Sequence, residues 1–191
     1  MKCAFAVLLA PVLAGCLSAH VPTVSDWNVT AEVAARRPDA AAFGVASLSQ
    51  VSVCAPYDIR PMQVSRSDGT LAADAYNRFA AVPSRLLREP ARTVLEAAGR
   101  FRAVVEPTSA ATVSHVIELT VTDLRLDCAQ AENGPERREA VAEVFALVLD
   151  KDRGIVASAR AAAREDARSG NYGAAFSKAF ARALGDAAAK L

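Results

Sequence analysis

The stretch AVAEVFALVLDKDRGI, residues 140–155, decides the fold. Apolar residues run almost without a break through 140–149, which is typical of a strand buried on both faces. The turn-forming residues DKDRG follow at 150–154, and an apolar run resumes at Ile155, so the pattern predicts a hairpin. These two antiparallel strands form the centre from which the rest of the chain is placed.

A third strand is predicted at 113–128, before this hairpin. Its apolar residues fall at odd positions up to Val121 and at even positions from Leu124 onward. Side chains alternate between the two faces of a strand, so one extra residue near Thr122 and Asp123 would return both sets to one face. The sequence thus predicts a β-bulge at this point and three antiparallel strands in succession.

Shorter strands and two helices complete the expected fold. The shorter strands are predicted at 45–53, 60–66, 71–76 and 101–105. A helix is predicted over 87–98 and ends at Gly99; Pro90 either lies in its first turn or follows a short turn that begins at Pro83. A second helix closes the chain with one apolar stripe, formed by Phe176, Phe180, Leu184, Ala187 and Leu191. These elements predict an α+β fold, an antiparallel β-sheet with both α-helices packed on one face.

Length and composition fit one globular domain. The chain has 191 residues, of which 52% are hydrophobic and 23% charged, which supplies a core and excludes disorder throughout. Lys and Arg number 22 against 21 Asp and Glu. A protein that binds nucleic acid through its phosphates needs a cationic surplus on one face, so this balance argues against a nucleic-acid partner.

The amino-terminal residues predict export. Lys2 precedes an apolar run from Ala4 to Leu13, and small residues follow. Ten helical residues rise about 15 Å, half of the roughly 30 Å hydrocarbon core, so this run is too short to span a bilayer. The pattern therefore predicts a cleaved signal peptide at residues 1–15.

Leu13-Ala14-Gly15-Cys16 resembles the bacterial lipobox. The resemblance implies cleavage before Cys16 and acylation of its thiol; an ordinary secretory leader with an incidental cysteine is the alternative. Two or more acyl chains hold a protein on a membrane without a transmembrane helix. Leu17, where many lipoproteins retained in the inner membrane carry aspartate, favours the outer membrane and its periplasmic face.

Residues 16–44 are predicted to form a lipidated N-terminus and tether, and residues 45–191 the folded domain. The first segment shows no sustained period of 2 or 3.6 residues. Such a segment lets a folded body stand off the membrane. Trp27 and Phe43 are the residues expected to dock parts of it onto that body.

Cys54 and Cys128 are the two cysteines outside the leader and the lipobox. An exported compartment permits disulfides, and each of these cysteines ends a strand-like run, so a disulfide between them is predicted. It would close a loop of about 75 residues and contribute roughly 4 kcal/mol in the chain-entropy model. Two separate buried thiols are the alternative.

The sequence carries no pattern typical of catalysis or metal binding. His20 and His115 each stand alone, and no Cys/His/Asp spacing matches a zinc site. The nucleophile elbow G-x-S-x-G, the P-loop and G-x-G-x-x-G do not occur. The segment from Asp150 lacks the glutamate that a calcium loop needs at its twelfth position, where Ala161 stands. We therefore expect a protein that is not an enzyme and that needs no cofactor.

Residues 56–66, PYDIRPMQVSR, are similar to the ABC-type transport auxiliary lipoproteins, the paraquat-inducible-protein C group. In that family a short strand follows this segment, and then a helix that opens with an N-R-W-A-like run. Residues 77–80, NRFA, stand in that place with phenylalanine for tryptophan. Residues 171–173, NYG, lead into an alanine-rich helix and resemble the family's ending, so the similarity covers roughly residues 45–190.

The resemblance implies a non-catalytic lipoprotein component of an ABC transport system. Its partners would be an MCE-domain (mammalian cell entry) periplasmic protein and an ABC permease and ATPase of the same system, with phospholipid as a candidate cargo. The protein would dock this assembly to the outer membrane. Two alternatives stay open: an outer-membrane assembly or plug lipoprotein of the lipopolysaccharide-export kind, and a carrier that holds lipid between its sheet and helices.

The segment that carries the resemblance is also the predicted docking site. Aromatic, flexible apolar and guanidinium side chains dominate binding hot spots, and a proline-flanked edge strand offers unpaired backbone groups to a partner. The predicted partner-binding residues are Tyr57, Arg60, Pro61, Met62, Val64 and Arg66. The structural alternative is that Arg60-Pro61 stiffens a turn and Tyr57 packs on the core.

Overall fold

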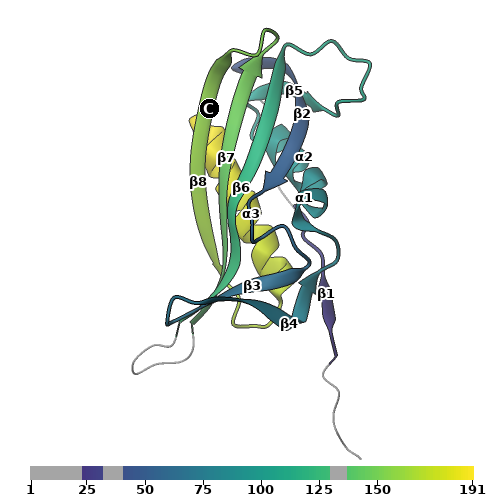
Figure 1. Ribbon diagram of the computed structural model, residues 1–191. Coiled ribbons are helices and arrows are strands. Elements are labelled where there is room, and N and C mark those ends of the chain that lie inside the picture. Colours follow the sequence, from purple (N-terminus) through teal and green to yellow (C-terminus); the bar gives the residue numbers. More distant parts are fainter. Residues whose placement is uncertain (1–22, 32–40, 130–136) are drawn as a thin grey trace, which may run out of the picture.

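The antiparallel centre of the structure is formed by β6 (His115–Ala129), β7 (Arg137–Asp150) and β8 (Ile155–Asp166). The computed structural model describes residues 23–31, 41–129 and 137–191 (Figure 1). In the turn between β7 and β8, a side-chain oxygen of Asp150 accepts hydrogen bonds from the amides of Asp152 and Gly154, each 2.8 Å long. The predicted hairpin is confirmed.

The sheet as a whole is mixed. Its other strands are β1 (Ser25–Trp27), β2 (Phe43–Val53), β3 (Pro61–Arg66), β4 (Leu71–Phe79) and β5 (Phe101–Val105). Both β2 and β3 lie parallel to β6, β2 against its first half and β3 against its last residues, and β2 is also parallel to β5. The α+β class is confirmed. The expectation of an antiparallel sheet is wrong, because parallel pairing between distant segments leaves no local turn signal.

β6 and β7 show the predicted change of phase. Their register shifts between Val121 and Asp123, which confirms the bulge. In the part of β7 predicted as buried on both faces, Val144 and its even-numbered neighbours are fully buried. Among the odd-numbered residues, Val141 and Leu149 are buried, but Phe145 and Leu147 between them are only half-buried. β7 is therefore covered fully on one face, because the helices lie on a single side of the sheet (Figure 1).

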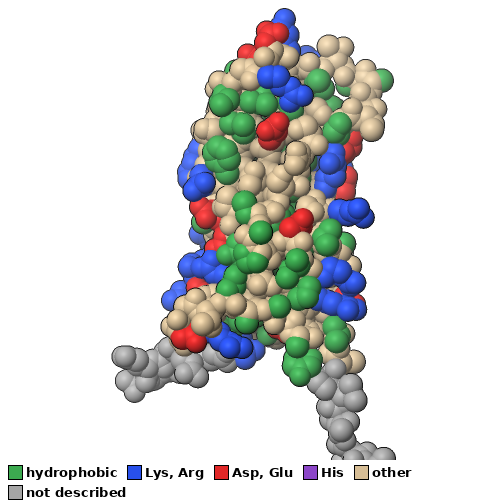
Figure 2. All heavy atoms as spheres, in the orientation of Figure 1, with side chains coloured by type: hydrophobic (Ala, Val, Ile, Leu, Met, Phe, Trp, Pro, Cys, Tyr) green, Lys and Arg blue, Asp and Glu red, His purple; other side chains and the backbone are tan. Residues whose placement is uncertain are grey.

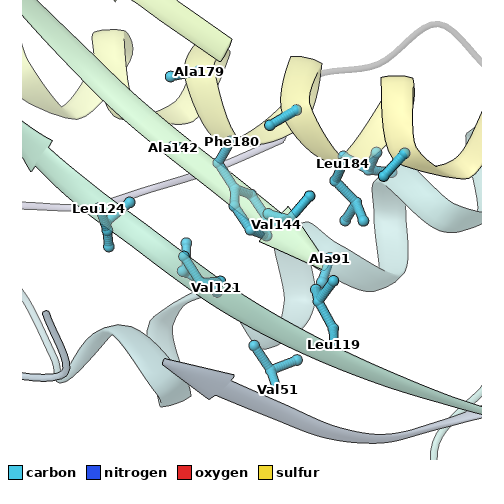
Figure 3. Packing of buried hydrophobic residues seen from close by; sticks show 14 of the residues in the cluster. Val51, Ala91, Leu119, Val121, Leu124, Ala142, Val144, Ala179, Phe180 and Leu184 are labelled. Atoms are coloured by element: carbon cyan, nitrogen blue, oxygen red, sulfur yellow. The ribbon is translucent and has the colours of Figure 1, made fainter. Parts of the chain in front are cut away.

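The C-terminal helix α3 (Tyr172–Lys190) provides much of the core. Its predicted stripe is confirmed: Phe176, Phe180, Leu184 and Ala187 are 0% exposed. Phe180 and Leu184 point from α3 toward the sheet, where Val144 lies (Figure 3). These side chains fill the space in which the lipid-carrier alternative would place a ligand.

A bent helix covers the other part of the same face. α1 (Pro83–Leu86) and α2 (Arg88–Ala97) are separated by Leu87, so the predicted helix is preceded by a short turn from Pro83. Pro90 lies in the first turn of α2, where a missing amide hydrogen costs little. Gly99 follows α2 with φ 68°, as expected of a glycine that ends a helix. α2 packs against α3, which confirms two helices on one face.

Candidate docking site

Part of the segment predicted as a tether belongs to the folded body. β1 pairs in parallel with β4, and Val29 beyond it is 2% exposed. The Trp27 indole Nε1 donates a hydrogen bond to the Asn77 side-chain oxygen at 3.0 Å, and its ring meets Tyr172 edge-on at 5.7 Å. The docking expected of Trp27 is confirmed, and the tether prediction is wrong for residues 23–31. The predicted lipidation site, Cys16, lies outside the described residues.

β1 lies so close to α3 that only glycine fits between them. A Cβ atom at Gly173 would lie 2.8 Å from the backbone oxygen of Asn28, nearer than real Cβ atoms approach. The amide of Thr30 also donates to the Ser177 hydroxyl at 2.9 Å. The residues that follow β1 are therefore held against the first turns of α3.

We expect Gly173→Ala to destabilise the protein by about 1–3 kcal/mol, because the backbone near Asn28 must move to admit a methyl group. Gly185→Ala is the matched control in the same helix. A Cβ there meets nothing within 4 Å, so about 0.5–1 kcal/mol of stabilisation is expected. Urea unfolding measures both values, and equal stability changes in the two variants would contradict the close approach.

An ion cluster joins β1 to its neighbours. Asp26 accepts hydrogen bonds from Arg78 Nε at 2.7 Å and from Arg60 Nη2 at 2.6 Å. The hydrogen bond from Arg78, supported by the charges of both guanidiniums, holds the pKa of the Asp26 carboxyl below its ordinary 3.8. Arg60 Nε also donates to the backbone oxygen of Phe79 at 3.1 Å. In the described structure, Arg60 therefore links β1 to the end of β4 through Asp26 and Phe79.

Acid is expected to loosen β1. A carboxyl whose pKa is lowered by folding stabilises the fold above its unfolded pKa and loses that contribution as pH falls toward the folded value. For Asp26 this window lies below about pH 4. Trp27, the single tryptophan, should report the change through its emission. In Asp26→Asn this part of the acid response should be absent, and an unchanged response in that variant would contradict the assignment.

Most of the predicted docking residues are part of the body. Met62 is 0% exposed, which excludes it from direct contact with a partner while the domain is folded. Tyr57 and Val64 are half-buried and pack against the core. β3 is an internal strand with β4 on one side and β6 on the other, so it is not the edge strand that was expected. Arg66, the last residue of β3, is exposed.

Of the two other motifs that resemble the family, one lies where the family pattern places it and one does not. Residues 77–79 end β4 instead of opening a helix, and the helical segment begins only at Pro83. Phe79 is 1% exposed, and its ring meets Phe176 at 5.1 Å. By contrast, Asn171 does start α3, and its side-chain oxygen accepts a hydrogen bond from the amide of Ala174.

No disulfide joins Cys54 to Cys128, so this prediction is wrong. The amide of Cys54 donates to the backbone oxygen of Val121, and Cys128 lies seven residues further along β6. At about 3.3 Å per strand residue the two cysteines are roughly 20 Å apart, far beyond the separation of about 4–7 Å that a disulfide bridges. The sequence pattern indicated strand ends but not which end of β6 meets β2.

A cleft of about 480 Å³ lies where β3, β6 and β7 meet near the start of α3. Arg66, Cys128 and Arg138 lie opposite one another on these three strands, and all line the cleft. The Tyr172 hydroxyl accepts a hydrogen bond from Arg138 Nη1 at 3.1 Å. The other lining residues are Val64, Ser67, Asp68, Asp74, Tyr76, Asn77 and Leu126. Of these lining residues, the sequence predicted only Val64 and Arg66 as docking residues, because which residues of β4, β6, β7 and α3 lie beside the end of β3 depends on the order of the strands in the sheet.

Exposed apolar side chains lie at two opposite ends of the body. Among the described residues, the large ones are Val24, Ile59, Leu71, Tyr76, Ile155 and Val156. The last two begin β8 beside the turn at 150–154, and the first four lie in or next to β1, β3 and β4 at the other end (Figure 1). β6 runs between the two ends, and its 15 residues span about 50 Å. On the face shown in Figure 2, hydrophobic side chains are scattered among polar ones, with Lys and Arg along both flanks.

Two other kinds of site are absent from the described part of the chain, a membrane-spanning helix and a metal site. Within residues 23–31, 41–129 and 137–191, no helix has the length and apolar character needed to cross a bilayer. In the same ranges, no three His, Cys, Asp or Glu side chains are grouped so that they could hold a metal ion.

Comparison with known proteins shows the fold. No protein-family model and no curated protein matches the sequence. A Xanthomonas campestris protein of the DUF330 family is similar in structure, with 21% identity, 88% of each chain covered and a TM-score of 0.56. An uncharacterised protein is 13% identical over 85% of this chain and 95% of its own, with a TM-score of 0.56. A lipoprotein candidate from Caulobacter crescentus matches 55% of this chain and 74% of its own at 22% identity, with a TM-score of 0.34. The first two establish a shared fold.

Proposed function

We propose that this chain is a non-catalytic lipoprotein component of an ABC/MCE-type transport system, which docks the periplasmic lipid-transport assembly to the outer membrane. The lipobox at residues 13–16 supports the anchor. The motifs at 57–66 and 171–173 support the transport system, since they are the ones that resemble its auxiliary lipoproteins.

The observation that carries the docking role is the exposed apolar pair at the start of β8. The side chains of Ile155 and Val156 are 69% and 46% exposed, and the strand that they open is paired only with β7 in the described structure. An edge strand offers backbone donors and acceptors, and apolar side chains beside it add affinity for a partner. The end that carries Ile155 is also the one away from β1, through which the chain leads back to Cys16.

This placement changes the predicted docking surface. Met62 is removed from it by burial, and Arg60 is bound in the cluster with Asp26. The cleft combines apolar residues with the guanidiniums of Arg66 and Arg138 and the carboxylates of Asp68 and Asp74. Apolar lining beside groups of both charges suits an amphiphile with a zwitterionic headgroup, such as a phospholipid. We assign the protein partner to the start of β8 and leave the cleft to the cargo.

The double variant Ile155→Asp/Val156→Asp is expected to lose most of the MCE-domain protein that co-purifies with the wild-type chain from detergent-solubilised membranes. Two charges on an apolar contact impose a desolvation cost on binding, and both positions are exposed, so the fold should persist. Ala162→Asp, at an exposed position of the same strand, is the control and should retain the partner. If the wild type, the double variant and Ala162→Asp all recover the same amount of MCE-domain protein, the start of β8 is not its binding surface. If the wild-type sample contains no MCE-domain protein, the proposed function is wrong.

A further inference from the structure

We propose that the end of the body formed by β1 and the β3–β4 hairpin rests on the lipid bilayer to which the chain is anchored. The inference rests on the proposed function, because it takes the acylated Cys16 as given. It goes further by assigning a membrane-contact surface and a fixed orientation to the folded body.

The length of chain before β1 limits where the anchor can be. Six residues lie between Cys16 and Thr23, where the described structure begins, so the chain takes seven residue steps from one to the other. Even a fully extended chain covers at most about 3.6 Å per residue, or roughly 25 Å in all. The body is about 50 Å long, judged from β6. Because β1 is held in place by β4 and α3, the anchor keeps this end near the membrane.

The same end exposes the side chains that a bilayer surface would cover. Val24 is 46% exposed and Tyr76 is 50% exposed. They precede Ser25 and Asn77, which are partners in the β1–β4 register, so Val24 and Tyr76 lie next to each other. Leu71 and Ile59, which are 39% and 41% exposed, belong to the start of β4 and the approach to β3. Four of the six exposed large hydrophobic side chains in the described residues thus lie at the anchored end.

The chemistry of this end fits a lipid headgroup layer. Tyrosine prefers the boundary between membrane and water, because its ring is apolar and its hydroxyl is polar. Arg66 is exposed at the end of β3, one residue after Ser65, the partner of Leu71, and can meet lipid phosphates. A scattered set of four apolar side chains would bind lipid weakly by itself, but the anchor raises its local concentration at the membrane.

The test uses tryptophan quenching in the full-length, lipidated protein. The protein is placed in vesicles of phosphatidylethanolamine and phosphatidylglycerol that contain a lipid brominated near the headgroup. Tyr76→Trp and Ile155→Trp each add one tryptophan to Trp27, and the wild-type signal gives the background. Both substitutions are at exposed positions, one at each end of the body. We expect quenching of the added tryptophan to be severalfold stronger at position 76 than at position 155.

Flotation of the vesicles distinguishes the two ways in which the inference can fail. If the wild-type protein does not float with vesicles, the anchor is wrong and the orientation falls with it. If the protein floats but quenching is equal at the two positions, or stronger at position 155, the anchor stands and the orientation is overturned.

Discussion

Replacing Cys16 by serine is expected to release the protein from the membrane fraction. A serine hydroxyl does not replace the thiol that the proposed lipobox would present for acylation. Each buried methylene of an acyl chain contributes about 0.8 kcal/mol, so loss of the chains lowers membrane affinity by many orders of magnitude. Fractionation of cells followed by an alkaline carbonate wash measures the effect.

Cys3→Ser is the matched control for this variant. Cys3 belongs to the predicted signal peptide, so its thiol is absent from the mature protein and attachment should be unchanged. If Cys16→Ser stays in the washed membrane pellet as fully as Cys3→Ser does, the chain is held there by something other than an acyl group on Cys16.

Phe180→Ala is expected to cost about 3–5 kcal/mol of folding stability. The ring is 0% exposed and packs between α3 and the sheet, so its loss removes apolar contacts and leaves a cavity (Figure 3). Domains of this size are stable by roughly 5–15 kcal/mol, so a large share would be lost. Lys178→Ala, two residues earlier on the exposed side of α3, should change stability by no more than about 0.5 kcal/mol. Urea unfolding that gives similar values for both variants would contradict the packing of α3.

The sequence predicts those elements whose signal is local and long. β6 and α3 each carry a period that repeats several times, β7 is a long apolar run, and a change of phase near Val121 located the bulge. Turns with Asp and Gly, such as the one at 150–154, reveal which neighbours along the chain are antiparallel. These are the parts of the fold that were predicted correctly.

Pairings between distant segments could not be predicted in this way. The parallel contacts of β2 and β3 with β6 depend on chain crossings that no short motif encodes. This explains why β3 was expected at an edge and why Cys54 was paired with Cys128. β1 has three residues, too few to show a period, and its position depends on Trp27 meeting Asn77 and Tyr172 across the fold.

The candidate site was predicted only in part for the same reason. Residue type suggested Met62 as a contact residue, but a flexible apolar side chain serves equally well in a core, where it lies. Ile155 and Val156 were recognised as strand residues; that no further strand covers them follows only from the complete sheet order.

In the proposed arrangement, one end of the body contacts the membrane and the other end binds the MCE-domain protein. Photocrosslinking in cells tests this arrangement most directly. A photoreactive side chain is placed at position 155 or at position 71 of the full-length protein, and the adducts are identified by mass spectrometry. The account predicts a crosslink from position 155 to an MCE-domain protein, and crosslinks from position 71 to lipid without that protein. An MCE-domain adduct at position 71 with none at 155, or no protein adduct from position 155, would contradict it.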